Sequence, residues 1–205
     1  MKIFIAAAHG ANDPGAVANG TTEREEAIKV VNGAAALIAL LGSPSYQMVI
    51  VPHDLGLKEA VAYINKHTTD IAKDICIEVN MNSNVGTPQT GTETFYGLPK
   101  LAQTLQKNLV ATLGLKDRGA KNGNNLYFNN STKPGSALVE LGFINNMADL
   151  MVVRNLGALA LAKGVAEYIG LQLPPTAPVP PSAIDWKQQY KNLRAAVQKV
   201  LNDNI

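Results

Sequence analysis

Segments typical of strands and segments typical of helices alternate along most of this chain, and this order constrains its fold more than any other feature. Short apolar runs indicate buried strands, whereas apolar residues spaced three or four apart indicate helices. The predicted strands cover residues 2–8, 47–51, 74–81, 92–96, 126–128 and 137–142, and the predicted helices cover 23–41, 57–67, 98–113, 148–154 and 158–168. Consecutive parallel strands need such crossover helices, which pack on the faces of the sheet. The sequence therefore predicts an α/β fold, a single three-layer domain whose mostly parallel, twisted sheet of about six strands carries helices on both faces.

The character of the chain changes near residue 173. Its 205 residues, of which 46% are hydrophobic, suffice for one well-buried domain. From Leu173 the segment LPPTAPVPPSA holds five prolines in eleven residues, and proline disrupts the interior of helices and sheets. We therefore predict an α/β domain over residues 1–172, a proline-rich, semi-rigid linker over 173–183 and a C-terminal helix over 184–205.

Composition excludes several classes of partner. The net charge is only +2 and no long basic run is present, so we expect no nucleic-acid partner. No apolar stretch is long enough to span a bilayer, so we expect no membrane partner. Cys76 is the single cysteine, which excludes an intramolecular disulfide and a cysteine-based zinc site. Lys2 and the six apolar residues after it do not form a secretory signal, so we expect the protein to be made in the cytoplasm without one.

A histidine ends the first predicted strand. The apolar run from Ile3 to Ala8 leads directly to His9, which Gly10 and a loop of small residues follow. Binding crevices in open α/β sheets lie outside the carboxyl ends of the strands, and neutral imidazole is the commonest protein ligand for a transition metal. His9 is therefore a candidate metal ligand.

Three further polar residues are predicted to lie near the same edge of the sheet. Glu23 begins the first helix, Asn80 ends the third strand, and Glu140 lies within the apolar sequence ALVELGF. A buried carboxylate is costly unless it is paired, bound to a metal or protonated. Glu140 is thus a second candidate functional residue, the alternative being a structural carboxylate that accepts hydrogen bonds from backbone amides.

A nucleotide-binding fold is the obvious competitor, because a loop of small residues follows the first strand. That loop, HGANDPGAVANG, fits neither G-x-G-x-x-G nor G-x-x-x-x-G-K-[ST]. A histidine at the strand end is also unexpected where the backbone must approach a phosphate. Both features argue against nucleotide binding.

The order of these motifs resembles a known family, the zinc-dependent N-acetylmuramoyl-L-alanine amidases of the type-3 fold, which are cell-wall hydrolases of bacteria and of phage lysins. The matching segments span about residues 2–170 and are HGANDPGA, GTTE, IEVNMNSN, GTETFYG, RGAK and ALVELGFINN. The resemblance implies a zinc cofactor and peptidoglycan as substrate. It also implies cleavage of the amide between the lactyl group of N-acetylmuramic acid and the L-alanine of the stem peptide.

The resemblance assigns roles to particular residues. His9 matches the first zinc histidine, and Glu140 matches the catalytic glutamate, which would take a proton from water and pass it to the leaving amine. Glu23 matches the zinc glutamate because of its spacing from the preceding glycine, although Glu25 and Glu26 are nearby alternatives.

One position departs from the family pattern. Where the family has its second zinc histidine, this chain has Asn80, whose amide oxygen is a weaker donor for zinc than imidazole. Three explanations are open: a deliberate substitution that removes the ligand, natural coordination through the amide oxygen, or a natural inactive relative that binds wall fragments. The closeness of the surrounding match favours the first. With Asn80 the predicted metal ligands are His9, Glu23 and Asn80.

Three other residues are predicted to contact substrate. Asn82 matches an asparagine that follows the second zinc histidine by two positions, His53 follows the second strand at the same edge of the sheet, and Arg118 offers a cation to a substrate carboxylate. The main alternative function is a non-catalytic peptidoglycan-binding module of the same fold. We expect a monomer that acts on the cell wall, released as a phage lysin.

Overall fold

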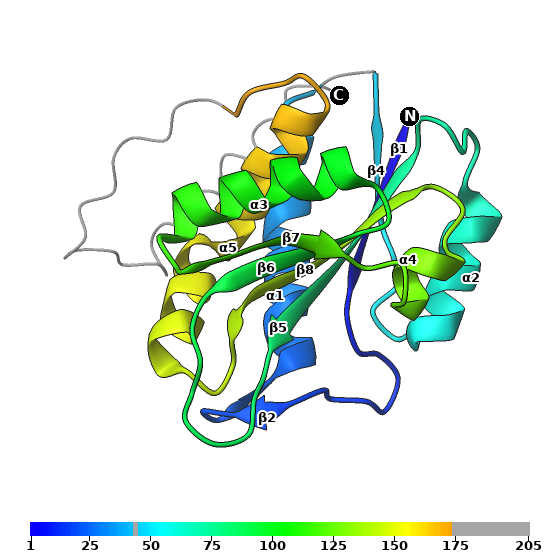
Figure 1. The fold of residues 1–205 in the computed structure, drawn as a ribbon. Coiled ribbons are helices and arrows are strands. Elements are labelled where there is room, and N and C mark those ends of the chain that lie inside the picture. Colours follow the sequence, from blue (N-terminus) through cyan, green and yellow to red (C-terminus); the bar gives the residue numbers. More distant parts are fainter. Residues whose placement is uncertain (43–44, 174–205) are drawn as a thin grey trace, which may run out of the picture.

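A six-stranded sheet forms the centre of the computed structural model, which describes residues 1–42 and 45–173 (Figure 1). The strands are β1 (Lys2–Ala7), β2 (Val17–Ala18), β3 (Thr21–Thr22), β4 (Gln47–Ile50), β5 (Ile75–Asn82), β6 (Thr92–Tyr96), β7 (Asp117–Asn122) and β8 (Gly135–Phe143). The helices are α1 (Glu23–Ala39), α2 (Leu57–His67), α3 (Pro99–Leu113), α4 (Tyr127–Ser131) and α5 (Met147–Tyr168). The main sheet has the order β4-β1-β5-β8-β6-β7, and β2 and β3 form a small hairpin.

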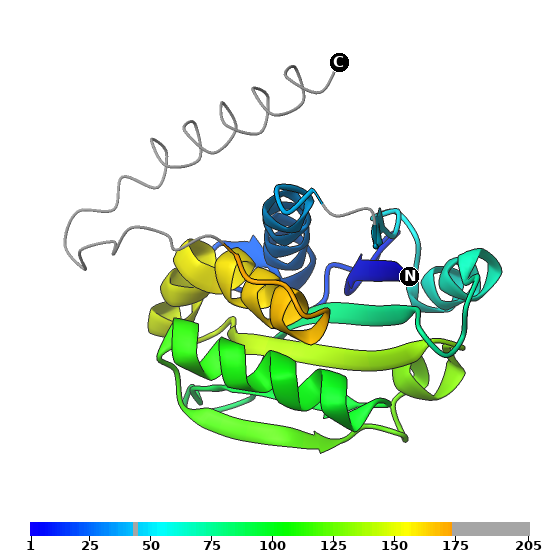
Figure 2. The ribbon, with the colours of Figure 1, turned by 90° about the horizontal axis from the view of Figure 1, so that it is seen from above.

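The sheet is mostly parallel, as predicted. β4, β1, β5 and β8 run in the same direction, while β6 is antiparallel to β8 and β7 is parallel to β6. The long helices α1, α3 and α5 lie together on one face, and α2 and α4 lie on the other (Figure 2). The α/β class, the strand number and the two helical layers are therefore confirmed.

Alternation along the strands divides the core between the two faces. In β1, Ile3 and Ile5 belong to the large apolar cluster under α1, α3 and α5, whereas Phe4 belongs to a smaller cluster under α2 and α4. Cys76 of β5 lies in the smaller cluster, and burial raises the pKa of its thiol to about 12. Side chains two and four positions beyond Cys76 therefore point to the face that carries α2 and α4.

The structure differs from the prediction in several elements. Residues 126–128, predicted as a strand, contribute instead to α4, because Phe128 packs into the smaller cluster from a short helix. The edge strand β7 was not predicted, since its sequence DRGAKN has no apolar run. The two helices predicted at 148–154 and 158–168 are one helix, α5, because Gly157 allows close contact with Val30 of α1 without ending the helix.

Thr22 caps the first turn of α1. The Thr22 hydroxyl accepts from the backbone N–H of Glu25 at 3.1 Å, and the Glu25 carboxylate accepts from the N–H of Thr22 at 3.3 Å. This reciprocal pair is a capping box, which satisfies two backbone donors that a helix start leaves free. Glu23 is thereby fixed as the first residue of α1.

The predicted linker beyond Leu173 and the predicted helix at 184–205 lie outside the described residues. In the part of the chain that the structure does describe, no helix is long and apolar enough to cross a bilayer.

A buried ion pair joins α1 to α5. Glu26, which is 1% exposed, accepts from Arg154 Nη2 at 2.8 Å and from Arg154 Nε at 3.1 Å. Lys29 and Thr21 also donate to this carboxylate. Burial raises the pKa of Glu26, but these hydrogen bonds outweigh it and hold the pKa at about 2.

We expect Arg154→Met to lower the free energy of unfolding by about 2 kcal/mol, because the buried carboxylate of Glu26 would keep fewer hydrogen-bond donors. The loss is limited because Arg154 is itself only partly buried. Lys29→Met, which removes an exposed partner, serves as the control and should cost less. Since the pKa of Glu26 is lower in the folded state, the pair stabilises fully above pH 4.5 and this contribution is lost as the pH falls toward 2. Urea unfolding at pH 7 and pH 3 measures both effects, and an equal loss at both pH values would contradict this account.

Candidate active site

A row of polar side chains crosses the sheet at the carboxyl end of its parallel strands. Asn80 of β5 lies opposite Glu140 of β8, and Glu140 lies opposite Glu93 of β6. The backbone N–H of Ala8 donates to the carbonyl of Val79 at 2.9 Å, so the residue after Ala8, His9, comes beside Asn80. The sheet register thus brings together His9, Asn80 and Glu140, which are far apart in the sequence.

The imidazole of His9 is held between two carboxylates. Its Nδ1 lies 2.8 Å from Asp13 Oδ2, and its Nε2 lies 3.3 Å from Glu23 Oε2. Gly15 completes this fit, since a Cβ there would stand 2.8 Å from His9 Nε2 and 2.9 Å from the Cβ of Glu23. His9 itself has a φ of 59°, a conformation that few residues other than glycine adopt. The backbone is therefore strained at His9, in the conformation that places this ring between the two carboxylates.

Glu23 is fixed by the backbone around it. Its Oε1 accepts from the N–H of Met81 at 3.2 Å and its Oε2 accepts from the N–H of Ala16 at 3.1 Å. Its two neighbouring glutamates are engaged elsewhere, Glu25 in the capping box and Glu26 with Arg154. Of the three carboxylates that the sequence left open, the structure brings Glu23 to His9.

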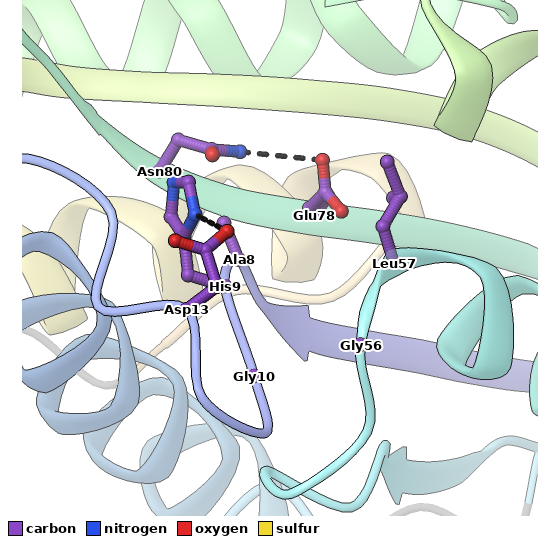
Figure 3. A pocket seen from close by; sticks show the side chains of 8 residues that line it. All are labelled: Ala8, His9, Gly10, Asp13, Gly56, Leu57, Glu78 and Asn80. Atoms are coloured by element: carbon purple, nitrogen blue, oxygen red, sulfur yellow. Dashed lines mark hydrogen bonds and ion pairs between the residues drawn. The ribbon is translucent and has the colours of Figure 1, made fainter.

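A pocket of about 250 Å³ opens beside His9 (Figure 3). The residues that line it are Ala8, His9, Gly10, Asp13, Gly56, Leu57, Glu78 and Asn80. Within it, the side-chain nitrogen of Asn80 donates to Glu78 Oε2 at 3.4 Å. Burial raises the pKa of Glu78 to about 7, although the hydrogen bond from Asn80 acts in the opposite direction.

Glu140 carries a carboxylate oxygen that is shielded from solvent. Its Oε2 has no hydrogen-bond partner among the described residues. Burial and the negative charges of Glu23, Glu93 and Glu78 raise its pKa well above 4.5. A carboxyl group in such surroundings is suited to accepting and returning a proton near neutral pH.

Two residues predicted to bind substrate meet at Glu93. Asn82 donates to Glu93 Oε1 at 2.7 Å, and Arg118 Nε lies 3.2 Å from the same oxygen. Lys121 pairs with the other oxygen of Glu93, and the Arg118 guanidinium lies over the ring of Phe143 at 5.1 Å. Cationic and amide groups are therefore gathered next to Glu140, and their contact with substrate stays a prediction.

His53 is placed differently. Its Nε2 lies 3.1 Å from Asn32 Oδ1 of α1, and the residue is not among those that line the pocket of His9. Its predicted contact with substrate is untested.

Sequence reasoning missed Glu78 and Glu93 as members of the site. Glu78 lies in the apolar stretch ICIEV and Glu93 in a strand whose first residues are buried. An acidic residue in an apolar strand is the signal that singled out Glu140, and it applies equally to Glu78.

In the described part of the chain, His, Cys, Asp and Glu side chains alone do not make up a complete set of metal ligands. Among residues 1–42 and 45–173, no three His, Cys, Asp or Glu side chains are grouped so as to hold a metal ion. His9 and Glu23 supply one nitrogen and one oxygen donor that are 3.3 Å apart. Two ligands of one tetrahedral zinc ion, each about 2.0–2.1 Å from it, stand about 3.3 Å apart. The two residues therefore fit a shared ion, and Asn80, which lines the same pocket as His9, is a neutral oxygen donor on the neighbouring strand.

In the metal-free protein, we expect His9 to titrate with a pKa of about 9, because the Glu23 carboxylate, and to a smaller degree Asp13, favours the protonated ring. Glu23→Gln should bring this pKa down toward 6.5. Because the pKa is higher in the folded state, the pair stabilises fully below pH 6.5 and the contribution is lost as the pH rises through 9. NMR titration of the imidazole in the presence of a chelator measures the shift. A pKa that Glu23→Gln leaves unchanged would contradict the geometry.

Comparison with known proteins shows the family of the chain. The family model described as N-acetylmuramoyl-L-alanine amidase matches residues 3–170. The chain is 31% identical over 154 residues to the uncharacterized protein YqiI of Bacillus subtilis, covering 72% of each chain. It is 29% identical over 178 residues to the N-acetylmuramoyl-L-alanine amidase LytC of Bacillus subtilis, covering 81% of this chain but only 35% of LytC.

Solved structures show the same fold. The catalytic domain of the amidase CwlV from Bacillus (Paenibacillus) polymyxa is 25% identical, with a TM-score of 0.67 over 84% of this chain and 100% of that domain. The amidase AmiC2 of Nostoc punctiforme, at 22% identity, has a TM-score of 0.73 over 83% of this chain and 97% of that one. The family model covers most of the chain. The chain therefore belongs to the N-acetylmuramoyl-L-alanine amidase family, and the expectation of a peptidoglycan amidase is confirmed.

Proposed function

We propose that hydrolysis of the bond between N-acetylmuramic acid and L-alanine takes place at the pocket beside His9. In this proposal a zinc ion is held by His9, Glu23 and Asn80, and Glu140 moves the proton. The observation that carries it is the 3.3 Å separation of His9 Nε2 and Glu23 Oε2. Glu140 lies opposite Asn80 in the sheet, and its Oε2 has no hydrogen-bond partner within the described part of the chain.

Each of the three donors is prepared for a cation in a different way. Asp13 accepts from Nδ1 of His9 and so directs Nε2, the other ring nitrogen, toward Glu23 and the ion. Glu23 is held rigidly by two backbone N–H groups. Asn80 supplies an uncharged amide oxygen, which binds zinc more weakly than imidazole does. Zinc binding must also displace the proton that the Glu23 carboxylate stabilises on His9. The affinity for zinc should therefore rise with pH up to about 9.

Bound zinc would lower the pKa of water and polarise the scissile carbonyl. Glu140 then accepts the proton of the attacking water and donates it to the amine of L-alanine as that group leaves. The surroundings of Glu140 suit both steps, because burial and three neighbouring carboxylates favour its protonated form. Glu140 does not bind the ion in this proposal, so its loss should affect turnover and not the metal.

Substrate is held by the groups around Glu93. Arg118 is half-buried and Lys121 is exposed, and both lie on β7, which β6 separates from the strand of Glu140. They offer positive charge to a carboxylate of the stem peptide. Asn82 of β5, which donates to Glu93, offers an amide. This arrangement supports the predicted substrate contacts of Asn82 and Arg118, whereas nothing in the pocket supports that of His53.

The site of action is the cell wall. The amidase relatives support this assignment, and release as a phage lysin and a monomeric state remain predictions. The second candidate function is a peptidoglycan-binding module without activity, which the neutral donor Asn80 favours because it weakens the metal site.

Zinc content and clearance of bacterial cell walls, measured for the unmodified chain and for Asn80→His, decide between these functions. An enzyme should hold about one zinc per chain, and Asn80→His should bind zinc about tenfold more tightly or better and clear walls faster. His67→Asn serves as the control, because His67 bonds to the carbonyl of Tyr63 outside the pocket. Absence of zinc and of lysis in both forms would overturn the enzyme proposal.

Glu140→Gln should lower the rate of wall clearance by about 10²–10⁴-fold, since it removes the group that transfers the proton. Zinc content should not change. Glu167→Gln, which alters an exposed carboxylate paired with Lys107 on the surface, is the matched control and should clear walls at the original rate. Activity retained by Glu140→Gln, or zinc lost from it, would refute the role given to Glu140.

A further inference from the structure

Glu78 and Asn80 form a pair inside the pocket. They are two residues apart on β5, so their side chains point to the same face of the sheet, and both line the pocket beside His9. Glu78 is 6% exposed and Asn80 is 8% exposed. A carboxylate buried this deeply is costly unless it is paired, protonated or bound to a metal.

The hydrogen bond between the two side chains fixes which end of the amide is free. The NH₂ group of Asn80 can only donate a hydrogen bond, and a carboxylate oxygen of Glu78 can accept it whether or not Glu78 is protonated. The structure shows this orientation, with Asn80 Nδ2 donating to Glu78 Oε2 at 3.4 Å. Figure 3 shows the amide of Asn80 beside the His9 ring with its nitrogen turned toward Glu78. The amide oxygen is therefore the end left for a ligand.

We propose that Glu78 is a positioning residue that keeps the amide oxygen of Asn80 available to the metal ion, so that a glutamate–asparagine pair takes the place of one histidine. The inference rests on the metal site of the proposed function. It follows the general rule that a metal ligand is oriented by a hydrogen bond on its far side, as Asp13 orients His9.

Direct binding of the ion by Glu78 is the competing explanation. Among the described residues, the hydrogen-bond partner of the Glu78 side chain is Asn80 and not His9 or Glu23. The described ranges also contain no group of three acidic, histidine or cysteine side chains arranged around a common point. The geometry therefore favours an action of Glu78 through Asn80.

The first test is zinc affinity, measured by competition with a chromophoric chelator on the full chain. Glu78→Gln should weaken binding by about 10–100-fold, the usual cost of losing the residue that orients a ligand. Glu78→Asp keeps the charge but withdraws the carboxylate by one methylene, and it should also weaken binding. Glu59→Gln removes an exposed charge whose carboxylate lies beside Gly56 of the pocket wall, and it should leave affinity unchanged.

Measuring Glu78→Gln again in the Asn80→Asp variant distinguishes an action of Glu78 through residue 80 from direct binding of the ion by Glu78. In Asn80→Asp, the carboxylate at position 80 cannot donate a hydrogen bond to Glu78. The amide introduced by Glu78→Gln, however, can donate a hydrogen bond to that carboxylate. The loss caused by Glu78→Gln should therefore disappear or reverse in the Asn80→Asp background. Direct binding by Glu78, or a simple charge effect, predicts a loss by the same factor in both backgrounds, and that result would overturn the inference.

The outcomes distinguish this inference from the proposed function. If the unmodified chain binds no zinc, the metal site itself is refuted. If it binds zinc and Glu78→Gln binds equally well, only the role of Glu78 is refuted. Thermal unfolding without metal shows whether each variant is folded, and if Glu78→Gln is not, Glu78→Asp alone and combined with Asn80→Asp supplies the comparison.

Discussion

Electrostatic repulsion among buried carboxylates is the constraint on which the rest of this site depends. Glu23, Glu78 and Glu140 approach one another at the carboxyl end of the sheet, and the raised pKa values of Glu78 and Glu140 reflect their burial and mutual repulsion. The imidazole of His9 faces this group, and its pKa is raised to about 9, mainly by the hydrogen bond to Glu23. A cluster of this kind is stabilised by positive charge, which protons supply in the free protein and a divalent cation would supply in an active enzyme.

The parallel register of the sheet creates this cluster. Because β1, β5 and β8 run side by side in the same direction, residues from the start, middle and end of the chain arrive at one edge. α2 and α4 cover Phe4 and Cys76 on this face, and the polar residues follow beyond them. The same strands that bury the core therefore also place the polar groups of the candidate site.

Most of the fold and the centre of the site could be predicted from the sequence. Apolar periodicity identified the inner strands and long helices, and His9, Glu23 and Glu140 were conspicuous as polar residues at the ends of apolar elements or inside them. β7 could not be predicted, since an edge strand is held by backbone pairing with β6 and needs no apolar run. The pairing of Glu78 with Asn80, and the gathering of Asn82 and Arg118 around Glu93, depend on side-chain contacts that spacing alone does not reveal.

The central claim is that His9, Glu23 and Asn80 share one divalent ion. Crystals soaked with zinc and measured on both sides of the zinc absorption edge test it most directly. The account predicts one strong anomalous peak in contact with His9 Nε2, a carboxylate oxygen of Glu23 and the amide oxygen of Asn80, at bond lengths of about 2.0–2.2 Å. A fully soaked crystal with no peak between His9 and Glu23, or with its peak at another site, would contradict it.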